Sequence, residues 1–459
     1  MNRRRGGRAG RVATAATAAM CVMAAGPAQQ AWAAGEPAPY AFPDGVKTVK
    51  GATTTSDAPS LTAGTPYRDS IEKDEKLVYR VDLDADTHAY VSAVAIPKAG
   101  TKVAYADELK VTLQDRDGSD CDSSTTRFGT AEFARPMAAY AHRTLKEGRS
   151  LCQKAGTYYV VVQRTSKDGS SPGPWDLEIR HVLEPGLKTA GPTAAPRDWP
   201  SRSPEAAQGG APRERAGGSS FFDAPGLTDG EWTDRIEPGQ SRFYRVPVDW
   251  GQQLFVSADI GSASGSGFVA GALPVSLYNP ALGLVDSADS LFYDGKQKST
   301  SLDPLPPVAY ENRFDSDSSV ENTRFAGWYY LRVSLNPQVG EKFGEKAYGL
   351  TLRIHVRGTP EAAPPYAGPA GIFAVTQDDK DAAASGQSGP QAGRGDTMRL
   401  VGVAGIGTGT VLVLGLGAWT LLGRRRAAAA ATAAAGQPGR PEQSAGSAQS
   451  SGYGPPAAW

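Results

Sequence analysis

The sequence is poor in the residue types on which most catalytic and metal sites depend. Its 459 residues include four histidines and three cysteines, and no HExxH zinc motif, P-loop or dinucleotide-binding glycine pattern occurs. A hydrolase needs a nucleophile with a base, or a metal with its ligands. We therefore expect a protein that is not an enzyme and that needs no cofactor. Structural or surface roles are expected for the four histidines, His88, His142, His181 and His355.

Cysteine is scarce, and its placement indicates an oxidising compartment. Cys21 lies in an apolar N-terminal segment, which leaves Cys121 and Cys152 in the body of the chain. An even pair outside the cell is expected to form a disulfide. Such a bridge would contribute roughly 3 kcal/mol by the chain-entropy model.

Long apolar runs are confined to the two ends of the chain. Residues 1–33 carry arginines, an Ala-rich stretch and an Ala-x-Ala site, which is the order of a secretory signal peptide. Residues 400–423 contain no charged side chain, and about 20 apolar residues are enough for a transmembrane helix. Three arginines follow directly, Arg424, Arg425 and Arg426. Basic residues stay in the cytoplasm, so we expect a single-pass membrane protein with an extracytoplasmic N-terminal part and a cytoplasmic C-terminus.

The predicted span contains a small-xxx-small pair, Gly405 and Gly409, that would let another helix approach closely. The alternative is that glycine is simply common in such helices. Residues 424–459 are rich in Ala, Gly, Ser and Pro and are expected to be disordered. The part of the chain between leader and span is mildly acidic, which argues against nucleic acid as a partner.

One stretch of the sequence occurs twice. Residues 67–94 align without a gap with residues 232–259, and Tyr-Arg-Val at 79–81 recurs at 244–246. Internal repeats identify repeated structural units, and this unit is long enough for a domain. We place the first domain at residues 61–184 and the second at 221–358. Each is long enough to bury a core.

The segments around these domains have the composition of linkers. Pro, Gly, Ala, Ser and Thr are frequent in residues 34–60, 185–220 and 359–397. We expect these segments to be a flexible leader, a disordered interdomain linker and a stalk, respectively.

Within both copies the pattern is that of β-strands. Apolar and polar side chains alternate over residues 79–84 and again over 244–249. Short segments of this kind recur between turns rich in Gly, Pro and Asp, and no long segment between the ends has a helical apolar period. Many short strands with such turns predict β-sandwiches.

The strand and turn landmarks of both copies resemble the bacterial pre-peptidase C-terminal domain family. In the second copy these landmarks are a turn and strand at 236–246, Leu-Tyr-Asn-Pro at 277–280, Gly-x-Tyr-Tyr-x-x-Val at 327–333 and the strand at 348–352. The resemblance implies an accessory module that is often found beside secreted proteases and sometimes binds glycans or proteins. No protease domain accompanies it here. The resulting fold prediction is all-β, with two tandem jelly-roll-like β-sandwich domains and one C-terminal transmembrane helix.

An acidic loop in the first copy has two interpretations. Asp115, Asp117 and Asp120 lie close together around a glycine, and calcium prefers such carboxylates. Asp and Gly also supply the backbone angles of a hairpin turn. The second copy keeps the turn at 279–283 and drops the charge, so we favour the turn over a metal site. An enzyme that uses these loop carboxylates is the least favoured alternative.

Two tryptophans occur in the second copy alone. Trp250 aligns with Ala85 in a turn, and Trp328 aligns with Thr157 on a strand. An exposed tryptophan can stack on a sugar ring or anchor a protein contact. The alternatives are packing under a loop for Trp250 and cross-strand packing for Trp328.

These features together predict a non-enzymatic cell-surface binding or scaffold protein whose partner is a protein or a cell-envelope glycan. Two narrower hypotheses stay open. The chain could bind envelope polysaccharide through Trp250 and Trp328, or it could be an accessory subunit of a membrane protein complex that packs through Gly405 and Gly409.

Overall fold

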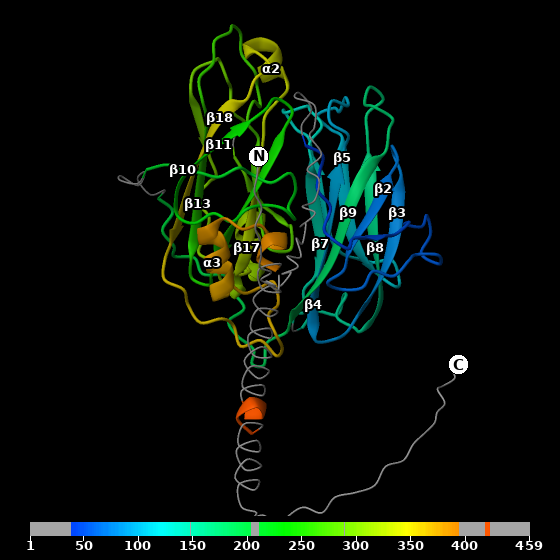
Figure 1. Cartoon of the computed structure of the whole chain (residues 1–459). Helices are drawn as coiled ribbons and strands as arrows, with labels where there is room; N and C mark the ends of the chain where they lie inside the picture. The colour runs from blue at the N-terminus through cyan, green and yellow to red at the C-terminus, as the bar shows by residue number, and fades with distance from the viewer. Residues whose placement is uncertain (1–37, 147, 203–210, 289, 394–417, 423–459) are drawn as a thin grey trace, which may run out of the picture.

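The computed structural model describes residues 38–146, 148–202, 211–288, 290–393 and 418–422. Within these ranges the chain is mainly β, and four sheets form two β-sandwich units that lie side by side (Figure 1). No helix in the described residues is both long and apolar enough to cross a bilayer. Several predicted features lie outside the described residues and stay predictions: the signal peptide, Gly405, Gly409, Arg424, Arg425 and Arg426.

Unit 1 is built from nine strands in two sheets. One sheet has the order β1-β2-β9-β4-β7, and the other has the order β3-β8-β5-β6. The strand bounds are β1 (Lys47–Thr48), β2 (Pro66–Ile71), β3 (Lys76–Leu83), β4 (Thr87–Ile96), β5 (Glu108–Asp115), β6 (Asp120–Arg127), β7 (Met137–Arg143), β8 (Gly156–Thr165) and β9 (Trp175–Pro185).

Unit 2 repeats this plan, with the sheets β10-β11-β18-β13-β16 and β12-β17-β14-β15. Its strands are β10 (Arg213–Glu214), β11 (Gly230–Ile236), β12 (Ser241–Val248), β13 (Gln253–Ile260), β14 (Val275–Tyr278), β15 (Leu284–Ser287), β16 (Lys298–Ser301), β17 (Gly327–Ser334) and β18 (Tyr348–Arg357). Four helical segments accompany them: η1 (Tyr310–Phe314), α1 (Ser318–Glu321), α2 (Gln338–Phe343) and α3 (Gln377–Ser385).

The repeat predicted from the sequence is confirmed, because the strand order of unit 1 recurs strand for strand in unit 2. The register recurs as well. Tyr67 pairs with Ile179 on β9, and its counterpart Trp232 pairs with Leu352 on β18. The predicted alternation is also present, since Val81 on β3 and Val246 on β12 are fully buried in the two cores.

Each unit begins earlier than the sequence predicts, with a glycine that packs against a core tyrosine. The Gly51 amide donates to Asp69 Oδ2 over 2.7 Å, and the Tyr79 hydroxyl donates to the same oxygen over 2.8 Å. A Cβ on Gly51 would lie 2.8 Å from Tyr79 Cζ, so a larger residue does not fit without a shift. Residues 47–60 therefore belong to unit 1 and are not a flexible leader. The same arrangement recurs in unit 2 with Gly217, Asp234 and Tyr244.

The two units pack sheet against sheet. Val94 on β4 of unit 1 shares a buried apolar cluster with Phe243 and Tyr278 of unit 2. A second cluster joins Tyr90 on β4 to Phe325 of unit 2. Eight consecutive residues of β4, 88–95, are buried because one face covers the core of unit 1 and the other covers unit 2. The sandwiches thus form a continuous stack of sheets.

A buried carboxylate fixes this interface. Glu184 on β9 is fully buried and accepts hydrogen bonds from the Tyr90 hydroxyl over 2.6 Å and the Tyr366 hydroxyl over 2.7 Å. Arg313 of unit 2 donates to both of its oxygens, over 2.7 and 3.2 Å. Burial opposes ionisation, but the charge of Arg313 and these hydrogen bonds lower the pKa of Glu184 to about 2. The ion pair is tolerated in the interior because its polar atoms are bonded.

Parts of the predicted linker and stalk fold onto the units. Leu187, in the predicted linker, forms a β-bridge with Tyr366, in the predicted stalk, and Phe373 is fully buried. Helix α3 begins with a capping box formed by Thr376 and Asp379. The composition predicts extended chain here, but a few apolar side chains are enough to fix a Pro- and Gly-rich segment on a surface.

Candidate functional site

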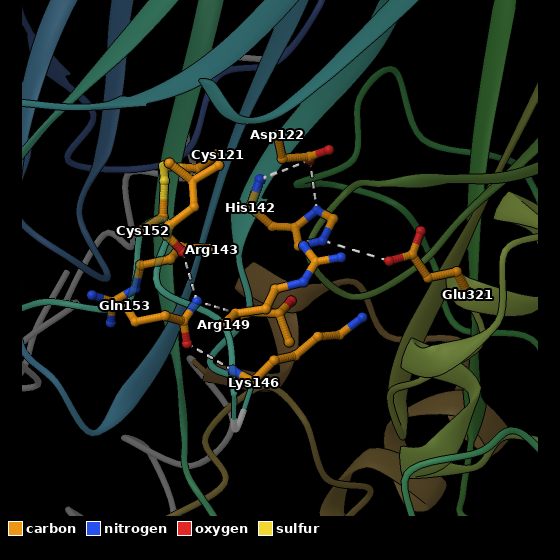
Figure 2. Close-up of a pocket in the computed structure, with 11 residues that line it drawn as sticks. Cys121, Asp122, His142, Arg143, Lys146, Arg149, Cys152, Gln153 and Glu321 are labelled. Atoms are coloured by element: carbon orange, nitrogen blue, oxygen red, sulfur yellow. Dashed lines mark hydrogen bonds and ion pairs between the residues drawn. A yellow bond between two sulfur atoms is a disulfide. The ribbon is translucent and has the colours of Figure 1, made fainter. Parts of the chain in front are cut away.

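A polar cavity of about 210 Å3 opens where unit 1 meets unit 2 (Figure 2). Unit 1 supplies β6, β7 and the loop 144–153, and unit 2 supplies α1. The ionisable residues of its lining are Asp122, His142, Arg143, Lys146, Arg149 and Glu321.

His142 lies between two carboxylates that come from different units. Its Nδ1 is 2.6 Å from Asp122 Oδ2, and its Nε2 is 3.5 Å from Glu321 Oε1 (Figure 2). Burial opposes ionisation of Asp122, yet hydrogen bonding and charge from His142 outweigh it and hold the pKa of this carboxyl below its usual value. Burial also opposes ionisation of Glu321, but its hydrogen bond with His142 and the charges of Arg324 and His142 lower its pKa. His142 thus contributes to the contact between the units.

The predicted disulfide is confirmed and forms one wall of the cavity. Cys121 on β6 is bonded to Cys152, and their Cα atoms are 5.7 Å apart. Gln153 orders the loop, because its Oε1 accepts from the Lys146 amide over 2.8 Å and its Nε2 donates to the carbonyl of Leu151 over 3.0 Å. The described parts of this loop, 144–146 and 148–153, are therefore joined to each other beside the cavity.

The charged residues of this cavity match no motif in the sequence. Lys146 and Arg149 lie in a loop that joins β7 to β8, and the matching connection of unit 2 has a different sequence and contains η1 and α1. The signal that could have found them is the group of basic residues before Cys152, because the matching connection of unit 2 contains no cysteine. A cavity of this size and polarity is suited to a small polar or charged group.

Trp250 is placed where it cannot stack on a sugar. It is 4% exposed and belongs to the core cluster of unit 2, with its ring centroid 6.4 Å from that of Tyr366. It borders a second cavity of about 390 Å3, between the segments 187–192 and 361–365. Its indole N–H has no hydrogen-bond partner among the described residues. The packing alternative holds for this tryptophan.

Trp328 is half-buried, and both its ring and its N–H are engaged. Its Nε1 donates to Asp379 on α3 over 2.7 Å, and the Arg245 guanidinium lies 3.9 Å from its ring centroid. The ring therefore anchors α3 to the sheet. Helix α3 lies in the segment that was predicted to be a stalk.

The acidic loop of unit 1 is the hairpin turn between β5 and β6. Asp115 Oδ1 accepts from the amides of Asp117 and Ser119 over 3.0 and 2.9 Å. Asp120 accepts from the Gln114 side chain over 2.8 Å. In the part of the chain that the structure describes, no group of three or more His, Cys, Asp or Glu side chains is placed to hold a metal. The loop thus forms the predicted turn.

One segment has the GxSxG spacing of a hydrolase nucleophile but not its setting. Residues 169–173 read Gly-Ser-Ser-Pro-Gly and lie in the loop between β8 and β9. A nucleophile elbow needs a strand followed by a helix. The Ser171 hydroxyl instead accepts from the Lys102 amide over 2.9 Å, which ties two loops together.

Exposed aromatic side chains gather at the end of the molecule that carries α2. Phe268 and Phe292 are 64% and 61% exposed, and a β-bridge between residues 269 and 293 brings them onto adjacent segments. Tyr105 is 54% exposed and lies in a loop of unit 1. This loop is hydrogen-bonded to residues 129–132, which lie beside residue 271 of unit 2. This end lies opposite residues 418–422 (Figure 1).

No protein-family model matches the chain, and no curated protein sequence matches it. Among solved structures it has distant similarity to the CBM22-1-CBM22-2 tandem domain of Paenibacillus barcinonensis Xyn10C (12% identity, 61% of this chain and 82% of that chain, TM-score 0.18). The CUB1-EGF-CUB2 domain of human MASP-1/3 is similar at 8% identity, with 63% and 99% covered and a TM-score of 0.15. The ANXUR2 extracellular domain of Arabidopsis thaliana is similar at 6% identity, with 64% and 86% covered and a TM-score of 0.17.

TM-scores this low carry no conclusion about function. The resemblance to the pre-peptidase C-terminal domain family also stays a prediction, since no family is identified.

Proposed function

We propose that the chain is a non-enzymatic binding or scaffold protein of the cell surface, with both sandwich units outside the membrane and the C-terminus in the cytoplasm. We also infer that each unit is a jelly roll, because the orders β2-β9-β4-β7 and β3-β8-β5-β6 distribute successive strands between two sheets as in that fold.

The observation that best supports a binding role is the cavity that the two units build together. It is closed on one side by a disulfide that only unit 1 carries, and on another by Glu321 of unit 2. A site that needs both copies gives a reason for their fusion into one body. The disulfide also supports an extracytoplasmic location, since such bonds persist in oxidising compartments.

The test incubates the purified full chain with cell-envelope fractions and measures two quantities, co-sedimentation and release of cleaved product. We expect saturable co-sedimentation without product release. Reproducible hydrolysis that one substitution such as His142→Ala abolishes would overturn the proposal, because the chain would then be an enzyme.

A polysaccharide ligand is the second candidate, and the exposed rings of Tyr105, Phe268 and Phe292 favour it. Aromatic faces on an exposed surface can stack on sugar rings. Replacement of Phe268 and Phe292 by Ala should then weaken co-sedimentation with envelope polysaccharide, whereas Trp328→Ala should not. Unchanged binding in the Phe variant would reject this candidate. A role as subunit of a membrane complex stays a proposal, to be tested by crosslinking in membranes with Gly405 and Gly409 replaced by Leu.

A further inference from the structure

We propose that the junction cavity binds an oxyanion, namely the phosphate or carboxylate group of an acidic envelope polymer. This inference rests on the proposed binding function and names the chemistry of its ligand. The evidence for it is that three basic side chains line one cavity and that the most buried of them has no ion-pair partner in the described structure.

Arg143 brings a desolvated positive charge to the cavity wall. Its side chain is 1% exposed, and its two terminal nitrogens donate only to backbone carbonyls, those of Lys154 over 3.4 Å and Thr87 over 2.5 Å. Its Nε has no hydrogen-bond partner among the described residues. A buried guanidinium normally pairs with a carboxylate or a phosphate. In the described structure Arg143 forms no such pair, and its guanidinium lies 5.4 Å from the ring centroid of Tyr158, so no carboxylate neutralises its charge at the cavity wall.

Lys146 and Arg149 add two further cations to the same lining. Burial, and then the charge of Arg149, lowers the pKa of the half-buried Lys146. The lysine Nζ lies 5.4 Å from the ring centroid of Phe314 in unit 2, so this side chain is held at the junction. Neither cation has a carboxylate partner in the described residues. Glu147, their neighbour in the sequence, is outside those residues.

The two carboxylates of the described lining are already engaged. Asp122 lies 2.6 Å from His142, and Glu321 accepts from Arg324 over 3.1 Å. Both carboxylates therefore already have partners within the protein. The remaining charge of the lining is positive, which is the condition under which an anion gains from entering a partly desolvated cavity.

The disulfide loop explains how the cations are kept together against their repulsion. Cys152 anchors the end of the loop to β6, and Gln153 bonds to its backbone at two points. The cost of ordering the loop backbone that carries these side chains is thus met during folding and not during binding, which favours affinity for a small group.

The test is isothermal titration calorimetry, which measures the affinity of the full chain for each of two probes, glycerol 3-phosphate and glucuronate. The chain is kept in detergent at constant ionic strength. The variant Lys146→Ala with Arg149→Ala removes two cations at partly exposed positions, so folding should be retained. Arg143 is left in place, because replacing a buried arginine risks misfolding. The matched control is Arg116→Ala, an exposed arginine of unit 1 whose nearest carboxylate, in Asp117, lies 3.7 Å away.

We expect saturable binding of at least one probe, weakened about tenfold or more in the double variant, because two of the positive charges that attract the anion are removed. Arg116→Ala should bind like the original chain. The probe that binds more tightly identifies a phosphate or a carboxylate source. Saturation by neither probe, or equal affinity in the double variant, would overturn the oxyanion site.

Failure of this inference can be told apart from failure of the proposed function. If the probes do not bind but the same protein still co-sediments with envelope material, the oxyanion site is rejected and the binding role stands. If neither the probes nor the envelope fractions bind, both are rejected.

Discussion

Units 1 and 2 share one strand order, and they differ most where they meet. The connection from β7 to β8 in unit 1 is a loop closed by Cys152, whereas the matching connection from β16 to β17 in unit 2 contains η1 and α1. Lys146 in the first connection contacts Phe314 in the second, and Glu321 in the second lies 3.5 Å from His142 at the end of β7. The copies have thus kept their cores and diverged at their common boundary, which is where the candidate site lies.

The largest expected effect on stability comes from removing the buried carboxylate of Glu184, which forms an ion pair between the units. Glu184→Ala leaves Arg313 without its ion-pair partner and removes the acceptor of Tyr90 and Tyr366. Loss of one partner of a buried pair costs about 3–5 kcal/mol. Chemical denaturation of the full chain measures this change in the free energy of unfolding.

The second copy provides the control for that substitution. Arg357 on β18 is the counterpart of Glu184 on β9. Glu184 follows the residue that pairs with Ala89, and Arg357 follows the residue that pairs with the equivalent Leu254. Unlike Glu184, Arg357 is exposed. Arg357→Ala should change stability by less than about 0.5 kcal/mol. Equal effects of the two substitutions would contradict the asymmetry of the units.

The next largest effect on stability is expected from removing the disulfide, which makes unit 1 resemble unit 2. Cys121→Ser with Cys152→Ser should lower the free energy of unfolding by about 3 kcal/mol, because the reduced unfolded chain gains conformational freedom. The measurement is urea unfolding with and without a reducing agent. The original chain should lose this stability on reduction and the double variant should not. A double variant as stable as the oxidised original would contradict the prediction.

A pH effect of similar or smaller size distinguishes His88 from its counterpart in unit 2, Gln253. Burial lowers the pKa of His88 from 6.5 to about 3. Its Nδ1 accepts from the Leu145 amide over 2.8 Å, which is consistent with a neutral ring. Between these two pH values the unfolded chain binds a proton at this position and the folded chain does not, so stability falls as the pH falls.

His88→Gln introduces the residue of the second copy and should remove this part of the pH dependence. From pH 6.5 to 4.5 the original chain should lose about 2–3 kcal/mol more than the variant. Denaturation at the two pH values gives the difference directly. Parallel losses in both proteins would show that His88 does not stay neutral when folded.

The smallest effect is expected at the β5–β6 turn. Asn279 Oδ1 accepts from two backbone amides, at 3.0 and 2.9 Å, just as Asp115 Oδ1 does in unit 1. Asp115→Asn should therefore change stability by less than about 0.5 kcal/mol. Calcium or a chelator should leave the melting temperature of the original chain unchanged. A calcium-dependent rise that Asp115→Asn abolishes would restore the metal hypothesis.

The strands and the disulfide could be predicted because their signals are local or few in number. Alternation over residues 79–84 reflects one face on a core, and two cysteines leave one pairing. The contact between the units could not be predicted in this way. Tyr90 and Glu184 look like ordinary strand positions in the sequence, and a glutamate is rarely buried unless it is paired with a residue elsewhere.

The ends of the units were misjudged for a different reason. Gly51 and Gly217 stand in equivalent places, but the residues around them differ, so the repeat is not visible there without the structure. Similarly, Tyr366 and Phe373 are isolated apolar residues in a segment whose composition predicts extended chain. Composition averages over a segment, whereas packing depends on single side chains.

The hydrogen bond from Tyr366 to Glu184 has a mechanical consequence. Tyr366 follows the last strand of unit 2, so a pull on the C-terminal side of the chain reaches this residue before it reaches β18. Helix α3 is met earlier still, through the contact of Asp379 with Trp328. Tension between the predicted anchor and a ligand would therefore act first on the contact of α3 with Trp328 and next on the junction of the two units, before it reaches β18.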